Sequence, residues 1–199
     1  MDILGLQKFR SDAASTLTTS PGVYALCDLD EIPIYVGQSK DGIRNRVRRH
    51  LTSARSDVIA NRQLDVWEVA YVWAYPCDVD RCSRLEAFLY HHFNRQSPLF
   101  NGAEPPIEPT PVDMPFNRAP EPAQRALALP EGEIARRLDP AIRAPRQIAQ
   151  YQMLADYFLN VKRNDQMARV MNVHFWRLKE MHETLMSAQT SLIFDNGED

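Results

Sequence analysis

Six residues in the first half of the chain carry side chains suited to phosphodiester hydrolysis: Tyr24, Tyr35, Arg46, His50, Glu86 and Asn101. A lone carboxylate can hold one hard divalent cation, which keeps most of its water and takes phosphate oxygens as further ligands. A guanidinium neutralises phosphate charge in the transition state. A phenol, whose pKa is about 10, acts as a base at neutral pH only where positive charge lowers that value. The set therefore suits hydrolysis of a phosphate ester if the fold brings it together.

The two tyrosines lie on the strands of a predicted hairpin. Gly22 to Leu29 is rich in β-branched and aromatic residues, which favours a strand. The acidic stretch DLDEIP follows as a turn, and Ile34 to Val36 forms the return strand. Tyr24 and Tyr35 are therefore expected on neighbouring strands, where their side chains can face each other across one sheet.

Two predicted helices carry the charged residues. A helix from Gly42 to about Ala54 places Arg46 and His50 four residues apart, so that they share one face. A second helix, within residues 78–96, carries Glu86 beside an apolar stripe rather than within it.

A third predicted strand completes the sheet. From Leu64 to Tyr75 the pattern alternates with period two, which sends five residues to one face: Trp67, Val69, Tyr71, Trp73 and Tyr75. Asn101 closes the segment after the second helix. The order ββαβα predicts an α+β fold, with a small antiparallel three-stranded sheet flanked by helices.

Prolines divide the chain into three parts. Only four of the 14 prolines precede Ala103, whereas ten lie between Pro105 and Pro145. Proline fixes φ and removes a backbone donor, which argues against a helix or a central strand there. We predict a module at residues 1–102, a Pro-rich linker or extended arm at 103–130 and an all-α region at 131–199.

The motifs of the first module resemble those of the GIY-YIG nuclease superfamily. GVY at residues 22–24 stands where the family has GIY, and YVG at residues 35–37 stands where it has YIG. The segment GIRNRVRRH, residues 42–50, matches the helix that carries the family's arginine and, four residues later, its histidine or tyrosine. Glu86 resembles the family's metal-binding glutamate, and Asn101 resembles its closing asparagine.

The resemblance, which covers roughly residues 20–102, implies a one-metal endonuclease that cuts DNA by attack of an activated water. Glu86 would bind Mg²⁺, for which Mn²⁺ can substitute, and Arg46 would hold the scissile phosphate. One tyrosine would take the proton of the water and the other would orient it, and which tyrosine does which is left open. His50 would relay a proton or bind phosphate, while Asn101 would fix the local backbone.

Positive charge gathers around these motifs although the net charge is −3. Positions 44–62 contain six arginines and only one acidic residue, Asp57. The arginines are Arg44, Arg46, Arg48, Arg49, Arg55 and Arg62. A solvated helix face would explain this pattern equally well on composition alone. Given the resemblance, we expect four cations to contact the nucleic-acid backbone without reading sequence: Lys40, Arg44, Arg48 and Arg49.

The C-terminal region leaves two interpretations open. Residues 144–163 have helical apolar spacing, and a further helix pair is expected from Asn164 to about Met186. If Ala168 takes the small-residue position of a helix-turn-helix, Asn172 falls at its turn, where φ is often positive. The alternative is a helical hairpin that packs on the first module or forms a dimer.

Bulk composition limits the setting and leaves rival functions open. No apolar run approaches the roughly 20 residues of a membrane span. The three cysteines are expected as free thiols, which favours a reducing compartment, and we therefore predict a cytoplasmic protein. The expected partner is double-stranded DNA, with a homodimer if both strands are cut. The alternatives are a non-catalytic DNA-binding or regulatory protein and a nuclease for single-stranded DNA or RNA.

Overall fold

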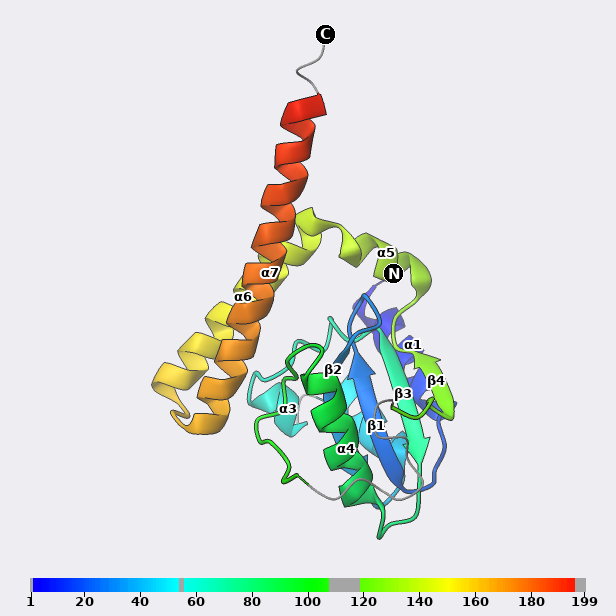
Figure 1. Cartoon of the computed structure of the whole chain (residues 1–199). Helices are drawn as coiled ribbons and strands as arrows, with labels where there is room; N and C mark the ends of the chain where they lie inside the picture. Colours follow the sequence, from blue (N-terminus) through cyan, green and yellow to red (C-terminus); the bar gives the residue numbers. More distant parts are fainter. Residues whose placement is uncertain (1, 54–55, 108–118, 196–199) are drawn as a thin grey trace.

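The protein is built around a four-stranded antiparallel sheet in the order β2-β1-β3-β4. The computed structural model describes residues 2–53, 56–107 and 119–195. The strands are β1 (Gly22–Cys27), β2 (Pro33–Ser39), β3 (Tyr71–Pro76) and β4 (Gln124–Leu127). Figure 1 shows the central pair β1 and β3, with β2 and β4 at the edges.

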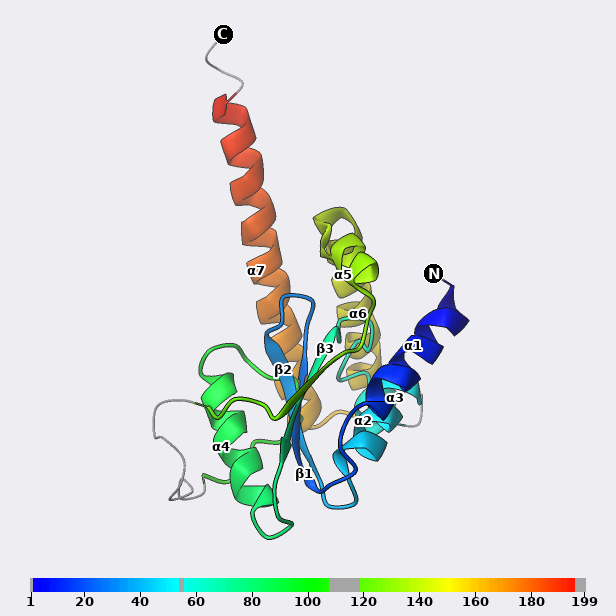
Figure 2. The ribbon, with the colours of Figure 1, turned by 90° about the vertical axis from the view of Figure 1, so that its right-hand side faces the viewer.

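Seven helices in the described part of the chain cover this sheet and extend from it: α1 (Ile3–Ser15), α2 (Ile43–Thr52), α3 (Asp57–Ala60), α4 (Cys82–Asn94), α5 (Glu131–Leu138), α6 (Pro140–Asn160) and α7 (Asp165–Asp195). In Figure 2 the sheet is seen nearly edge-on, with α4 on one side and α1, α2 and α3 on the other.

Alternating residues of β1 form two separate apolar cores. Tyr24 and Leu26 join the core with α1, α2 and α7, whereas Val23, Ala25 and Cys27 join the core with α4. This alternation follows from the period-two geometry of a strand. The predicted hairpin is confirmed, and β2 lies at an edge of the sheet, where side chains from its two faces can approach each other around the strand.

The predicted third strand begins seven residues later than expected. Residues 65–69 form turns, in which the Asp65 carboxylate accepts a hydrogen bond from Trp67 N–H. The Arg10 guanidinium lies 4.2 Å from the Trp67 ring centroid, so this indole packs on a cation outside the strand. The alternating pattern therefore marks a strand only from Tyr71 onward.

The sheet has four strands rather than the predicted three. β4 lies inside the segment that we predicted as a linker, and Tyr71 of β3 pairs with Leu127 of β4. An edge position tolerates the surrounding prolines because only one side of β4 pairs. Residues 108–118 of the predicted linker lie outside the described residues, as does Arg55 of the basic cluster.

The helix-turn-helix interpretation is wrong. α7 runs without a break from Asp165 to Asp195, so Asn172 is helical. Positive φ among described residues other than glycine occurs at Glu31 and Arg62. Met167, Val170 and Val173 of α7 instead join the core beneath the sheet, which agrees with the packing alternative.

Candidate active site

Three aromatic rings meet on the face of the sheet that α2 covers. The hydroxyl of Tyr24 and Nε2 of His50 share a hydrogen bond of 2.8 Å. The Tyr35 ring centroid lies 6.4 Å from that of Tyr24 and 5.8 Å from that of His50. Tyr24 and His50 are buried, whereas Tyr35 is half-buried. Of the three, Tyr35 is therefore the side chain that solvent reaches.

Gly37 provides the space that the Tyr24 ring occupies. The two residues are direct partners in the β1–β2 register. A Cβ atom at position 37 would lie 2.5 Å from the Tyr24 hydroxyl and 2.8 Å from Tyr24 Cζ, both far closer than van der Waals contact. The glycine of the YVG motif is thus required by the tyrosine of the GVY motif.

The start of α2 is fixed against the chain that precedes β1. Ile43 N–H donates to Ser20 C=O at 3.0 Å, and Arg44 N–H donates to Thr18 C=O at 3.0 Å. The N-cap residue, Gly42, has a φ of 109°, and a Cβ there would lie 2.4 Å from Thr19 C=O oxygen. These contacts set the positions of Arg46 and His50, which lie one and two turns beyond Gly42.

Glu86 approaches the other side of β2 from α4. Gln38 Nε2 donates to Glu86 Oε2 at 2.8 Å and also contacts Ser83 Oγ at 3.4 Å. Burial raises the pKa of Glu86 above its ordinary value, while hydrogen bonds from Gln38 and the charge of Arg46 act in the opposite direction. The charge of Arg46 also opposes the rise in the pKa of Tyr24, so it acts on groups from both faces of β2.

Burial dominates the titration of Tyr24. Its pKa is raised well above 10 by desolvation and then by Tyr35, and the opposing charge and hydrogen bond of Arg46 do not compensate. The charge of Arg46 therefore does not bring the pKa of the Tyr24 phenol into the neutral range. His50 Nδ1 lies 2.5 Å from Ser56 Oγ, so both imidazole nitrogens have a partner.

Asn101 holds the backbone of β2. Its Oδ1 accepts from Val36 N–H at 3.1 Å, and its Nδ2 donates to Val36 C=O at 2.7 Å. Val36 lies between Tyr35 and Gly37, so the amide fixes the strand segment that carries the second motif. The geometry agrees with the backbone role predicted for Asn101.

An open pocket of about 520 Å³ lies beside this cluster and is lined by Gln38, Ser39, Lys40, Asp41, Asn45, Arg46 and Arg49. Lys40 and Arg49, two of the four residues predicted to contact the nucleic-acid backbone, line this pocket. Arg44 instead donates from Nε to Leu17 C=O at 2.7 Å, and Arg48 is exposed without lining the pocket.

Two contributors were missed by sequence reasoning. Ser56 is fully buried against His50, and no local pattern connects a serine in a loop to a histidine six residues earlier. Asn45 lines the pocket from α2, and its position directly before Arg46 was the available signal.

The site fits a divalent ion that needs few protein ligands. Among the described residues no group of three or more His, Cys, Asp or Glu side chains could enclose a metal. Glu86 is half-buried, and its neighbours are an amide and a guanidinium. Mg²⁺ is commonly held by one or two carboxylates together with water and phosphate oxygens, and this donor set is compatible with that mode.

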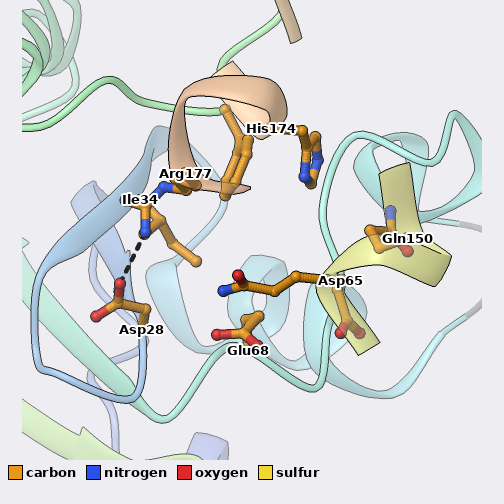
Figure 3. Close-up of a pocket in the computed structure, with 9 residues that line it drawn as sticks. Asp28, Ile34, Asp65, Glu68, Gln150, His174 and Arg177 are labelled. Atoms are coloured by element: carbon orange, nitrogen blue, oxygen red, sulfur yellow. Dashed lines mark hydrogen bonds and ion pairs between the residues drawn. The ribbon is translucent and has the colours of Figure 1, made fainter. Parts of the chain in front are cut away.

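A second cavity, of about 20 Å³, lies between the C-terminal helices and the sheet (Figure 3). Asp28, Glu68, His174 and Arg177 line it together with apolar neighbours. Arg177 Nη1 donates to Asp28 Oδ2 at 2.9 Å, and burial lowers the pKa of His174 to about 4. This volume holds about one water molecule, so we read the cavity as part of the packing interface.

Comparisons with known proteins agree with this geometry. Residues 20–98 match the family model of the GIY-YIG catalytic domain. UvrABC system protein C of Shewanella piezotolerans (strain WP3 / JCM 13877) is 39% identical over 56 residues, which cover 26% of this chain and 9% of that protein. The chain thus matches less than a tenth of that relative's length. No solved structure matches the chain, and no helix among the described residues is long and apolar enough to cross a membrane.

Proposed function

Because residues 20–98 are a GIY-YIG catalytic domain, we propose that this protein is a Mg²⁺-dependent endonuclease that hydrolyses DNA phosphodiester bonds by attack of water. One observation carries the proposal: Arg46 acts electrostatically on both the Tyr24 phenol and the Glu86 carboxylate, and it lines a polar pocket beside them. A guanidinium placed in this way can bind the phosphate between a group that moves protons and a group that holds metal.

The proposed roles follow from burial and hydrogen bonding. Glu86 holds Mg²⁺ through the carboxylate oxygen atoms left available beside the Gln38 amide, and Arg46 binds a non-bridging phosphate oxygen. Mg²⁺, when bound, supplies Lewis-acid stabilisation of the phosphoryl oxygens. Tyr35, the more accessible phenol, orients the attacking water.

Tyr24 is better placed to relay a proton than to exist as a phenolate. Its raised pKa keeps it neutral, and its hydroxyl is 2.8 Å from His50 Nε2. The attacking water must enter past Tyr35 to reach the buried Tyr24 oxygen. Its proton then passes to that oxygen while the Tyr24 proton passes to His50. Ser56 Oγ would accept a hydrogen bond from Nδ1–H and so hold the tautomer whose Nε2 can receive the Tyr24 proton.

The pocket favours duplex DNA over unpaired strands. Its seven lining residues are all polar or charged, and none is aromatic. Proteins that bind single strands combine a positively charged groove with aromatic side chains on which bases stack, whereas this pocket offers cationic and polar side chains for phosphates without an aromatic platform. Restriction, phage defence and repair are the roles we propose for such an enzyme, and the cytoplasmic location and the homodimer stay predictions.

End mapping on defined substrates tests the proposal. A labelled duplex and its separate strands are incubated with the protein in Mg²⁺, and the product ends are sequenced. We expect cleavage of the duplex, and we expect Arg46→Ala to slow it by about 10²-fold or more. Binding without any cleavage would support the non-catalytic alternative. Preferred cleavage of single strands or RNA would contradict the duplex assignment.

A further inference from the structure

Cys77 and Cys82 lie in contact at the junction between β3 and α4. Their Sγ atoms are 3.4 Å apart, and Cys82 Sγ also lies 3.4 Å from Asp78 C=O oxygen. Both are free thiols; Cys82 is buried, whereas Cys77 is half-buried and therefore reachable from solvent. Cys27, the third cysteine, is fully buried in β1. Two touching thiols, one of them accessible, are the starting arrangement for a disulfide.

The pair lies beside two of the elements that carry the proposed site, β1 and α4. Cys77 N–H donates to Pro21 C=O at 3.2 Å, directly before β1 and Tyr24. Cys82 is the first residue of α4, and Glu86 lies one turn farther along the same helix. The next residue, Ser83, contacts the Gln38 amide that holds Glu86.

We propose that Cys77 and Cys82 form a reversible disulfide that slows cleavage at the neighbouring site. The bond itself is independent of the proposed function, whereas its effect on cleavage rests on it. Bonded sulfur atoms are about 2 Å apart, so this pair must approach by more than 1 Å. The first turn of α4 moves with Cys82, and the Glu86 carboxylate shifts relative to Arg46.

A low-molecular-weight disulfide such as oxidised glutathione supplies the oxidant. Cys77 loses its proton, and the thiolate attacks one sulfur of glutathione disulfide, so that one glutathione leaves and takes up that proton. Cys82 then loses its proton and attacks Cys77 Sγ of the mixed disulfide, and the second glutathione leaves with that proton. Two protein thiols are oxidised and one glutathione disulfide is reduced to two thiols.

The environment of Cys77 makes this reaction slow at neutral pH. Burial and the adjacent Cys82 thiol raise the pKa of Cys77 to about 12. Because the thiolate is the nucleophile, the rate should rise about tenfold for each unit by which the pH increases, as long as the pH stays below that pKa. The pair should therefore respond to sustained oxidising conditions.

Intact-mass measurement of the full chain tests the bond. After incubation with oxidised glutathione, the wild-type protein and the Cys27→Ala control should each lose the mass of two hydrogen atoms. Cys82→Ala should stop at the mixed disulfide, and Cys77→Ser should remain reduced. An unchanged mass, or a mixed disulfide that persists in the wild-type protein, would overturn the proposal.

Cleavage of plasmid DNA by the same samples tests the effect on activity. Oxidised wild-type protein should cleave about tenfold more slowly and recover with dithiothreitol, while Cys77→Ser should be insensitive to the oxidant. Unchanged cleavage by fully oxidised protein would overturn the effect on activity. If the reduced protein cleaves no DNA, the proposed function fails and the effect on activity fails with it, while the mass measurement still decides whether the bond forms.

Discussion

Tyr24 and Gly37 occupy facing positions on two strands, and the Tyr24 ring fills the space that a side chain at position 37 would need. The Tyr24 hydroxyl then reaches His50, and His50 in turn reaches Ser56. Each side chain in this chain of contacts has a partner that fixes its orientation. The chemistry of the site therefore depends on small residues as much as on charged ones.

Gly37→Ala should damage both stability and cleavage. The new methyl group would overlap the Tyr24 hydroxyl and ring, and overpacking of this kind costs about 1–3 kcal/mol of unfolding free energy. Urea unfolding measures that loss, and cleavage should fall about tenfold or more because the phenol is displaced. Gly132→Ala is the control, since a Cβ there meets nothing within 4 Å. A Gly37→Ala protein with wild-type stability and activity would refute the space-filling role.

Glu86→Gln should be at least as stable as the wild-type protein at neutral pH. Burial raises the pKa of Glu86, so the folded state binds its proton up to a higher pH than the unfolded state does. Stability therefore falls as pH rises from the ordinary carboxyl pKa through the raised one, and ionised Glu86 costs stability above it.

Urea unfolding of Glu86→Gln and wild type at several pH values checks this sign. The advantage of the variant should shrink as the pH is lowered toward the ordinary carboxyl pKa. Glu180→Gln on α7, where the carboxylate is exposed, should show no such trend. A Glu86→Gln protein less stable than wild type at neutral pH would mean that the fold favours the ionised carboxylate.

The motif residues could be placed from the sequence because their spacing is local, whereas their partners could not. Arg46 and His50 share a helix face by periodicity, and the hairpin aligned Tyr24 with Gly37. Ser56 and the titration of Tyr24 depend on burial by residues distant in the sequence. Arg46 acts to lower the pKa of Tyr24, but desolvation raises it and is the larger effect.

At the scale of the elements, β2 organises the site because it lies at a sheet edge. Asn101 holds the backbone of β2 at Val36. Tyr35 points to the face that α2 covers, whereas Gln38 points to α4. The late start of β3, at Tyr71, shows that alternating apolar residues alone do not predict where a strand begins. Residues 64–70 alternate in the sequence, yet Asp65 and Trp67 make turn and cation contacts instead.

Arg49 of α2 should contribute to DNA binding through charge. It lines the pocket beside Arg46, so Arg49→Ala should weaken duplex binding and reduce the slope of log affinity against log salt by about 1. Fluorescence anisotropy in EDTA measures both quantities without cleavage. Arg136→Ala on α5, an exposed arginine that does not line the pocket, should leave the slope unchanged. An unchanged slope for Arg49→Ala would exclude a phosphate contact at this position.

At the scale of the whole molecule, α6 and α7 complete the core of the catalytic module. Figure 1 shows α6 and α7 side by side next to the sheet, with α7 continuing beyond it. Met167 joins the same apolar core as Tyr24, and Arg177 pairs with Asp28 directly after β1. Two cations of α7, Arg169 and Arg177, bind carboxylates within the chain. That use depends on distant partners and could not be predicted from helical spacing.

Arg177→Met should destabilise the protein by about 2–4 kcal/mol because it leaves the buried Asp28 carboxylate without its closest cation. Urea unfolding measures the change. Lys179→Met is the matched control two residues farther along α7, where the side chain is 60% exposed, and it should change stability by about 0.5 kcal/mol or less. Equal effects of the two substitutions would show that the ion pair does not anchor α7.

Glu86 and Arg46 form the proposed metal-dependent nuclease site, and relaxation of supercoiled plasmid tests this assignment most directly. The wild-type protein should convert the plasmid in Mg²⁺ and leave it intact in EDTA. Glu86→Gln, once urea unfolding has shown that it is folded, should cleave the plasmid about 10²-fold or more slowly in the same Mg²⁺ buffer. Cleavage in EDTA, or wild-type cleavage by folded Glu86→Gln, would contradict the proposed site.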